Sequence, residues 1–512
     1  MISDTKNGRI GTGGRAVRVV GPRRASASAA ATALGLVSTV LSLLGSWIPS
    51  LWGDEATSVL SAERPLPSLF WMLGRVDAVH GTYYLLMHFW VGAFGPSPFA
   101  MRVPSAIAAG LTVAGLVLLA TRLVSLRTGT FAGLVCLALP RITYMGEEAR
   151  GYALSAAVAV WLTYWLVGLL QNPTSSRRRW LLYALGVAFS AYIFLFGLLL
   201  LPAHAITVLA MRNRGLALRW VRWTALGLVL ALPIIGFGFF QRSQIAFLKD
   251  RMAATFSSVF VGQWFGNPLA AIVCWALVIA AIGVALAQWR RGRKPHIVGV
   301  ARRPDIALLA TAWLVAPAAI LLTVNFVDPI YSNRYLTFAA PAAALLIGYL
   351  LARTRPITVP IVLTIAIVAT SFSSYQSQRT PYAKNGSDWA AVAAVIHANA
   401  KPGDGMMFDE TINPSKRPRL GMRTYPYAYQ GLKDISLKTV WWKTDYWSDA
   451  TWPISQLPQH VGSITTIWLT EYRAAGSHHV DTYGRTELAS LRFSVTRTFK
   501  NHSSVTYELQ RR

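Results

Sequence analysis

Long apolar runs separated by short polar segments fill the first 372 residues of the chain. At roughly 20 residues per crossing, such runs span a bilayer as helices. Eleven spans are predicted near residues 32–50, 103–121, 128–141, 149–170, 180–193, 195–210, 223–240, 268–288, 305–324, 336–352 and 356–372. With 54% hydrophobic and only 14% charged residues, the composition excludes an ordinary soluble globule. The pattern predicts a polytopic α-helical membrane protein, with about 11 transmembrane helices in residues 32–372.

The charge distribution predicts an orientation. Lys and Arg gather in alternate connecting segments, where Asp4 is the only acid; these segments are 1–31, 122–127, 177–179, 212–222, 290–303 and 353–355. By the positive-inside rule they are cytoplasmic, and an odd number of spans places the C-terminus outside. The net charge of +28 is then an orientation signal, so no nucleic-acid partner is expected. Residues 1–31 are rich in Gly, Arg, Ser and Ala, which predicts a disordered basic cytoplasmic tail.

Residues 373–512 have a soluble, mixed composition and predict an extracytoplasmic α/β or α+β domain. Ser387 is expected to cap a helix that ends near Lys401, and strands are expected at 406–408, 464–469, 493–499 and 505–509. The aromatic residues of the irregular middle can either stack on sugar rings or pack on the membrane domain. They are Tyr425, Tyr427, Trp441, Trp442, Tyr446 and Trp447.

The predicted outer loop 51–102 is long for a connector and rich in aromatic residues. Its runs Phe70–Leu73 and Tyr83–Trp90 predict short helices lying along the membrane surface. Such helices would cover a cavity over the acids at the start of the loop. Both cysteines, Cys136 and Cys274, fall inside predicted spans, so we expect neither a disulfide framework nor cysteine metal ligands.

Two pairs of acids stand at the outer ends of predicted spans, Asp54 with Glu55 and Glu147 with Glu148. Carboxylates are costly at a membrane boundary, which makes these pairs candidates for chemistry. Simpler interpretations stay open. The first pair can be solvated loop acids, and Glu148 can form a structural ion pair with Arg150.

Five motifs follow one another along residues 32–372: Trp52–Ala56, His80–Trp90, Phe94–Ser97 with Arg102–Ser105, Glu148–Leu154, and Asn333–Leu336 followed by Pro341. In this order they resemble those of the GT-C glycosyltransferases, in particular the bacterial branch similar to protein O-mannosyltransferases and the lipid A aminoarabinose transferase. The Arg-rich, Ala-rich composition is typical of an actinobacterial-like member. The chain departs from the family pattern at Gly81-Thr82, where members often have Pro-Pro, and at Ile193-Phe194, where many have Thr-His.

The resemblance implies a membrane glycosyltransferase of the plasma membrane, with its active site on the outer face. It would move a sugar, mannose or arabinose favoured, from a polyprenyl-phosphate donor to an envelope glycan, lipoglycan or protein acceptor. Attack on the anomeric carbon in one displacement would invert its configuration. This reaction needs a base for the acceptor hydroxyl, and we assign Asp54 as that base, with Glu55 as its catalytic partner.

The departing phosphate needs positive charge, and Arg150 and Arg334 are the candidates for binding it. Tyr152, Tyr335 and His80 are further candidate hydrogen-bond donors to the donor phosphate. Glu147 and Glu148 are supporting acids. A divalent cation, Mg or Mn, is an open alternative, with Glu55 and Glu148 as its ligands. Arg334 can instead be an interface anchor whose charged end reaches the membrane surface.

A transporter or flippase of a lipid-linked sugar is the alternative function, because it also needs membrane cavities and buried arginines. The sequence shows no convincing internal repeat between halves, and its acids gather at one face instead of the midplane. A non-catalytic envelope assembly protein with the same fold is a third hypothesis.

Overall fold

The computed structural model describes residues 22–172, 174–249, 254–291, 304–473 and 483–512. Seven of its helices are long and apolar enough to cross a membrane, and shorter apolar helices accompany them. Each of the eleven predicted spans is found as a helix or a helix with a 3-10 turn. These elements are α1 (Pro22–Leu43), α5 (Pro98–Leu123), α6 (Leu126–Ala138), α8 (Tyr152–Gln171), α9 (Arg177–Ile193), α10 (Leu201–Ala210), α11 (Arg214–Phe240), α12 (Pro268–Arg291), α13 (Ile306–Val327), α14 (Ala340–Leu351) and α15 (Thr358–Ser377). The predicted fold class, a multi-pass helical membrane protein, is confirmed.

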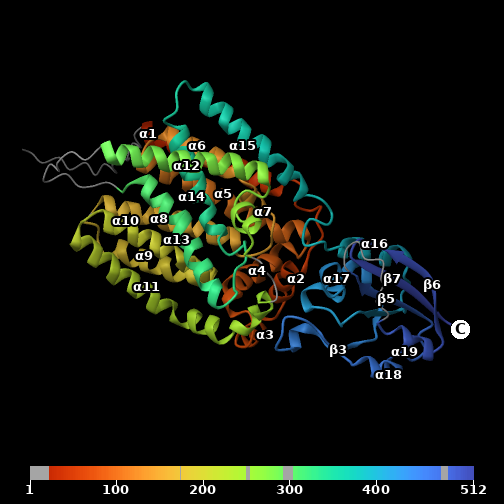
Figure 1. Ribbon diagram of the computed structural model, residues 1–512. Helices are drawn as coiled ribbons and strands as arrows, with labels where there is room; N and C mark the ends of the chain where they lie inside the picture. The colour runs from red at the N-terminus through yellow and green to blue at the C-terminus, as the bar shows by residue number, and fades with distance from the viewer. Residues whose placement is uncertain (1–21, 173, 250–253, 292–303, 474–482) are drawn as a thin grey trace, which may run out of the picture.

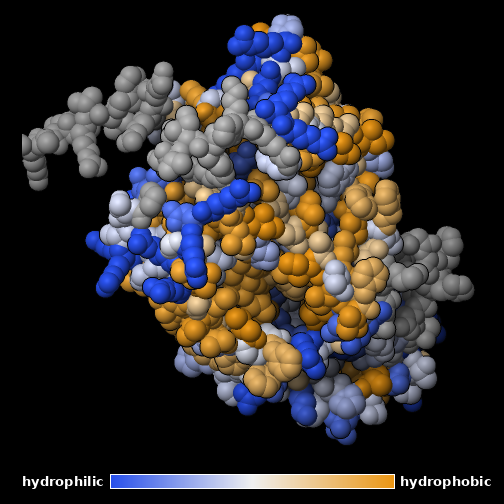
Figure 2. All heavy atoms as spheres, turned by 60° about the vertical axis from the view of Figure 1, so that its left-hand side comes forward, coloured by the Kyte–Doolittle hydropathy of each residue, from blue (hydrophilic) through white to orange (hydrophobic). Residues whose placement is uncertain are grey.

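These helices form one bundle, and the C-terminal domain lies beyond one end of it (Figure 1). Figure 2 shows a broad apolar surface over the bundle, bordered by a group of hydrophilic side chains. The exposed Arg212, Arg214, Arg290 and Arg291 stand at helix ends remote from the C-terminal domain (Figure 1). A charged end beside an apolar belt is the arrangement expected of a protein embedded in a bilayer.

Small residues allow the first two long helices to pack closely. A Cβ atom on Gly110 of α5 would lie 2.1 Å from Thr39 Oγ1, and one on Gly35 of α1 would lie 2.9 Å from the carbonyl oxygen of Gly110. Close backbone approach through small residues is the usual basis of helix association in membranes. This close approach holds α1 against α5. Helix α5 also contains Arg102, which belongs to the site described below.

The ends of the first helix differ from the prediction. Helix α1 begins at Pro22, so residues 22–31 are helical and do not belong to a disordered tail; residues 1–21 lie outside the described residues. The many Ala residues here favour helix without adding enough hydropathy to mark a span. The helix ends at Leu43, and Gly45 then adopts a φ of +74° that an L side chain rarely takes. Asp54 and Glu55 are therefore not at the end of a span.

Residues 51–97 form a set of short helices against the end of the bundle that faces the C-terminal domain (Figure 1). They are α2 (Gly53–Ala62), α3 (Leu66–Leu73), a 3-10 turn at Ala78–His80 and α4 (Gly81–Phe94). Helices α3 and α4 match the predicted surface helices, and Phe70 and Phe89 are exposed on them. Helix α2 was not expected as a separate element. A further short helix, α7 (Pro140–Gly146), precedes the second pair of acids.

The C-terminal domain contains a mixed five-stranded sheet with the strand order β2-β1-β5-β7-β6. The first three strands pair in parallel and the last two pair antiparallel. The strands are β1 (Gly405–Phe408), β2 (Lys433–Asp434), β5 (Thr466–Tyr472), β6 (Phe493–Lys500) and β7 (Ser504–Arg511), with β3 (Leu437–Thr439) and β4 (Ala450–Thr451) in a small second sheet. Its helices are α16 (Trp389–Asn399), α17 (Arg419–Thr424), α18 (Pro458–Val461) and α19 (Arg485–Ser490).

The domain packs on the short helices of residues 51–97, chiefly through its irregular middle. Tyr425 is buried, and its hydroxyl accepts a hydrogen bond from the Leu51 backbone N–H at 2.9 Å. The Trp441 indole donates to the carbonyl oxygen of Leu60 at 3.0 Å. Ser387 does not cap α16 as predicted, because its hydroxyl donates to the carbonyl oxygen of Leu51 instead. Some of the predicted aromatic set thus packs on the membrane domain, whereas Tyr427 stays exposed.

Candidate active site

Two acids and two arginines from distant parts of the chain meet where the short helices close the end of the bundle that faces the C-terminal domain. Asp54 stands in the first turn of α2, Glu148 and Arg150 lie between α7 and α8, and Arg334 lies between α13 and α14. Arg334 Nη1 is 2.6 Å from Asp54 Oδ2 and 3.6 Å from Glu148 Oε1. One guanidinium therefore bridges the two carboxylates.

Asp54 and Arg334 are partly exposed, whereas Glu148 is buried. Asp54 and Arg334 keep 26% and 24% of their side-chain surface exposed, but Glu148 keeps 1%. A molecule arriving from solvent or lipid can reach Asp54 and Arg334 together. Glu148 stands behind them, where it can set the local charge but offers little surface to a substrate.

Arg150 is held by a second network. Its Nη1 donates to the Asp54 carbonyl oxygen at 3.2 Å and to the Tyr84 hydroxyl at 3.1 Å, and that hydroxyl donates to Asp77 Oδ2 at 3.0 Å. Its Nη2 lies 3.0 Å from His80 Nε2. Because a guanidinium has only donors, His80 Nε2 must accept, so the ring is neutral with its proton on Nδ1. Burial, together with the positive charges of Arg150 and Arg334, lowers the pKa of His80 well below its usual value.

The Glu55 carboxylate is paired with Arg102 instead of Arg334. Arg102 Nε donates to its Oε1 at 2.8 Å and Arg102 Nη2 to its Oε2 at 2.5 Å, and neither side chain is exposed. The Ala149 backbone N–H also donates to Oε1, at 2.9 Å. Both carboxylate oxygens are therefore occupied. Glu55 ties α2 to α5 and to the segment that carries Glu148, and it stands one residue from Asp54.

Glu147 faces the C-terminal side of the bundle. Its Oε1 accepts a hydrogen bond from Lys384 at 3.2 Å, and its Oε2 lies 3.4 Å from Arg379. Lys384 is fully buried and its ammonium sits 3.8 Å from the centre of the Tyr144 ring. Glu147 is thus a link between the membrane domain and the segment that leads into the C-terminal domain.

Aromatic rings pack around Arg334 and its neighbour Tyr335. Arg334 lies over the rings of Trp52 and Tyr152, at 5.0 and 5.9 Å from their centres. Tyr335 stacks on Phe196 with ring centres 4.5 Å apart, and Phe194 meets Tyr152 edge-on. Phe194 is one of the departures noted in the sequence, and here an aromatic contact replaces a polar group.

The fold of this chain is similar to that of solved structures. No protein-family model and no curated protein matches the sequence. Among solved structures, ArnT from Cupriavidus metallidurans in the apo state superposes with a TM-score of 0.60 at 15% identity, over 94% of this chain and 98% of that one. ArnT is the lipid A aminoarabinose transferase, a GT-C superfamily member. The protein has the GT-C fold.

Two further GT-C structures are also similar. ArnT from the same organism bound to undecaprenyl phosphate superposes with a TM-score of 0.57 at 15% identity, over 93% of this chain and 97% of that one. An archaeal oligosaccharyltransferase, AglB from Archaeoglobus fulgidus, in complex with an inhibitory peptide and a dolichol-phosphate, superposes more loosely, with a TM-score of 0.42 at 11% identity, over 92% of this chain and 74% of that one. The resemblance inferred from sequence motifs is confirmed for the fold.

The geometry does not fit a divalent cation held by Glu55 and Glu148. Within the described ranges, no three His, Cys, Asp or Glu side chains group as metal ligands. Glu55 is taken up by Arg102, and the Arg334 guanidinium occupies the place between Asp54 and Glu148. With Arg150 nearby, these two carboxylates already face two fixed positive charges.

Sequence reasoning missed the partners that hold the site together. Arg102 appeared only as part of a motif, although an arginine in the first turns of an apolar run is a recognisable signal. Tyr84 and Asp77, which position Arg150, were not singled out. Lys384 lies in a segment of ordinary soluble composition, and nothing in the sequence marks it as the partner of Glu147.

Proposed function

We propose that this protein is a membrane glycosyltransferase that transfers a sugar from a polyprenyl-phosphate donor to an acceptor hydroxyl. The observation that carries the proposal is the partly exposed contact between Asp54 and Arg334, backed by Arg150 and set in a GT-C fold. A carboxylate and a guanidinium side by side supply the two groups that such a transfer requires. An ArnT structure bound to undecaprenyl phosphate makes a polyprenyl phosphate the first donor class to test.

In this mechanism Asp54 is the base. The acceptor oxygen forms a bond to the anomeric carbon while its proton passes to the Asp54 carboxylate. The bond between the anomeric carbon and the phosphate oxygen breaks, and its electron pair stays on that oxygen. Attack and departure on opposite faces invert the anomeric configuration. Asp54 suits this role because α2 holds it by its backbone, and its neighbour Glu55 is locked by Arg102.

Arg334 and Arg150 receive the departing phosphate. Negative charge grows on this group in the transition state, and guanidinium groups match phosphate oxygens while staying charged at any working pH. As phosphate reaches Arg334, the arginine shares its hydrogen bonds between phosphate and Asp54, which frees the carboxylate for the acceptor. Tyr152 and Tyr335 are proposed to line the donor side. Glu148 is proposed to adjust charge around Arg334, and Glu55 and Glu147 are proposed as positioning residues.

We also propose the sugar, the acceptor and the orientation in the membrane. We favour mannose or arabinose on the polyprenyl phosphate and an envelope glycan or lipoglycan as acceptor, in a plasma membrane with the N-terminus cytoplasmic. The basic helix ends remote from the C-terminal domain support that orientation.

The test is transfer by purified protein in detergent, with a panel of mannosyl and arabinosyl polyprenyl phosphates and extracted envelope acceptors, read by mass spectrometry. We expect a product with one donor, with inverted anomeric configuration by NMR. Movement of labelled lipid-linked sugar across proteoliposome membranes, with no transfer from any donor, would instead support the flippase.

A further inference from the structure

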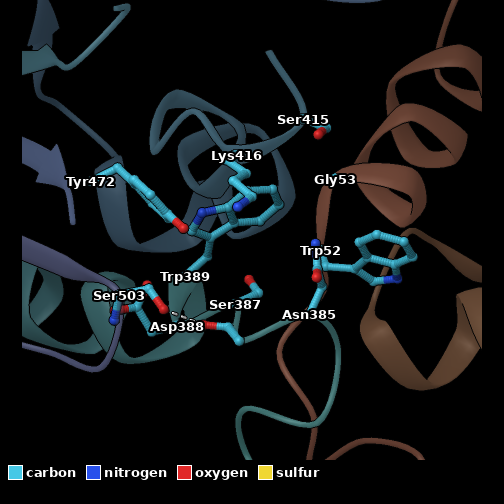
Figure 3. Close-up of a pocket in the computed structure, with 11 residues that line it drawn as sticks. Trp52, Gly53, Asn385, Ser387, Asp388, Trp389, Ser415, Lys416, Tyr472 and Ser503 are labelled. Carbon is cyan, nitrogen blue, oxygen red and sulfur yellow. Dashed lines mark hydrogen bonds between the residues drawn. The ribbon is translucent and has the colours of Figure 1, made fainter. Parts of the chain in front are cut away.

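The contact between the start of α2 and the C-terminal domain leaves little free space. A Cβ atom on Gly53 would lie 2.1 Å from the carbonyl oxygen of Ser415, and Figure 3 shows both residues at the edge of the hollow between the domains. This hollow has a volume of about 20 Å³, which is room for a single water molecule. It is therefore too small for a ligand larger than water.

A much larger pocket lies at one end of the strands of the C-terminal sheet, beside the end of α16. Its volume of about 380 Å³ is within the range of small-ligand sites, roughly 300–1,000 Å³. Residues of α16, β5, β6 and β7 contribute to its lining, and none of the lining residues belongs to the candidate active site. Figure 1 shows β6 at the side of the domain away from the bundle. The pocket is therefore separate from Asp54 and Arg334.

The lining of this pocket is polar and carries no net charge. Lys401 and Arg497 supply two positive charges, and Asp404 with Glu508 supplies two negative charges. The other lining residues carry amide or hydroxyl groups. Balanced charge favours neither anions nor cations, and a lining without apolar side chains offers no surface to a lipid tail. The pocket therefore suits a neutral ligand that is rich in hydroxyl groups.

The walls of the pocket are fixed by hydrogen bonds between its own elements. Arg497 of β6 donates to Glu508 of β7 and, from Nη1 at 2.9 Å, to Asn399 Oδ1 at the end of α16. Before β1, Asp404 Oδ2 accepts a hydrogen bond from the Trp468 indole at 3.0 Å. A ligand that binds here meets side chains that are already ordered, which lowers the entropy cost of binding.

Some of the lining groups keep free hydrogen-bonding capacity. Within the described part of the chain, the Lys401 ammonium, the Thr466 hydroxyl and Asp404 Oδ1 make no hydrogen bond or ion pair. They provide a donor, a group that both donates and accepts, and an acceptor. Because each sugar hydroxyl can both donate and accept, the hydroxyls of a sugar ring match this set.

We infer that this pocket binds a neutral oligosaccharide, as a carbohydrate site separate from the candidate active site. The inference goes beyond the proposed function and does not depend on it, because it concerns binding alone. If both hold, the C-terminal domain retains one part of a glycan chain while another part reacts at Asp54.

The test is saturation-transfer NMR on the full-length protein in lipid nanodiscs, since sugar-based detergents would compete for the pocket. The probes are mannotriose, arabinotriose and maltotriose, with inorganic phosphate as an anionic competitor. Thr466→Phe places an aromatic ring in the pocket and should abolish the signal. Lys401→Ala removes one charged donor and should weaken binding about tenfold. Thr498→Phe and Lys500→Ala are matched controls, because both residues are exposed on β6 and do not line the pocket.

We expect at least one trisaccharide to bind wild type and both controls, and to lose its signal in Thr466→Phe. The inference is overturned if no trisaccharide binds wild type, if Thr466→Phe and Lys401→Ala leave binding unchanged, or if Thr498→Phe loses the signal equally. Displacement of the sugar by phosphate would also contradict it, because the pocket would then be an anion site. None of these measurements needs turnover, so failure of this inference and failure of the proposed function can be told apart.

Discussion

At the scale of single residues, the contacts of Arg334 restrict the choice of side chain most strongly. It bridges Asp54 and Glu148 and lies over the rings of Trp52 and Tyr152. These contacts use the planar, forked shape of a guanidinium as well as its charge. A lysine at this position keeps the charge and loses the shape.

We therefore expect Arg334→Lys to weaken donor binding. Loss of one charge-assisted hydrogen bond is worth about 1.5–3 kcal/mol, which is roughly a 10–100-fold rise in the donor KM. The measurement is initial-rate kinetics with varied polyprenyl-phosphate sugar. A donor KM equal to that of wild type would remove Arg334 from the phosphate site.

The charge of Glu148 predicts a pH dependence. Burial raises the pKa of the Glu148 carboxyl, against the opposing effect of the Arg334 guanidinium. As pH falls through this raised pKa, Glu148 gains a proton and one negative charge near Arg334 disappears. The donor is a phosphate diester and does not titrate there, so its affinity should rise as pH falls.

Glu148→Gln removes this titration, and its donor KM should stay flat with pH at the value that wild type shows at low pH. The comparison is donor KM from pH 5 to pH 8 for both proteins. The same slope in wild type and variant would show that another group titrates.

At the scale of elements, helix α2 is the part of the site that depends most on its neighbours. It has 10 residues, and it carries Asp54 in its first turn. Such a short helix is marginal alone. Glu55 and Arg102 hold it to α5, with both side chains fully buried.

We expect Arg102→Met to be strongly destabilising, because it leaves the buried Glu55 charge without its partner. Breaking such a pair costs about 3–5 kcal/mol. The double variant Glu55→Met with Arg102→Met should recover part of that loss, since no charge is left buried. Thermal unfolding in detergent measures both, and equal stability of the single and double variants would contradict this account.

The helices that the sequence predicted correctly are those that coincide with an apolar run. The spans and surface helices α3 and α4 belong to this group, because burial in lipid or at its surface selects for hydrophobic residues. Helix α2 was missed, since its residues are small and polar and its position depends on Arg102, 47 residues away. The roles predicted for Asp54, Arg150 and Arg334 stay predictions, although the structure brings these residues together.

At the scale of the whole molecule, buried charges join the two domains beside the site. Lys384, in the segment before α16, pairs with Glu147, which is 237 residues away in sequence and next to Glu148. Lys384 also contributes to holding down the raised pKa of the Glu148 carboxyl. Lys384 therefore connects the segment before α16 to the surroundings of Glu148, a relation that no local sequence pattern could reveal.

Lys384→Met should lower the stability of the protein, because it removes the ion pair with Glu147 that holds the segment before α16 to the membrane domain. Glu147 would then keep only Arg379 as a partner, so we expect a loss below the about 3–5 kcal/mol of a fully unpaired buried charge, and Glu147→Gln should restore part of it in the double variant. Limited proteolysis of residues 378–388 and thermal unfolding report the effect. Additive effects of the two substitutions would mean that the pair is not coupled.

The central claim is that Asp54 acts as base in a transfer reaction, and the most direct measurement is single-turnover transfer by Asp54→Asn beside wild type, with donor binding measured on the same samples. General base catalysis is worth roughly 10²–10⁴-fold, so transfer should fall by at least about 10²-fold while the protein still binds the donor. Transfer by Asp54→Asn at the wild-type rate, with equal donor binding, would contradict the claim.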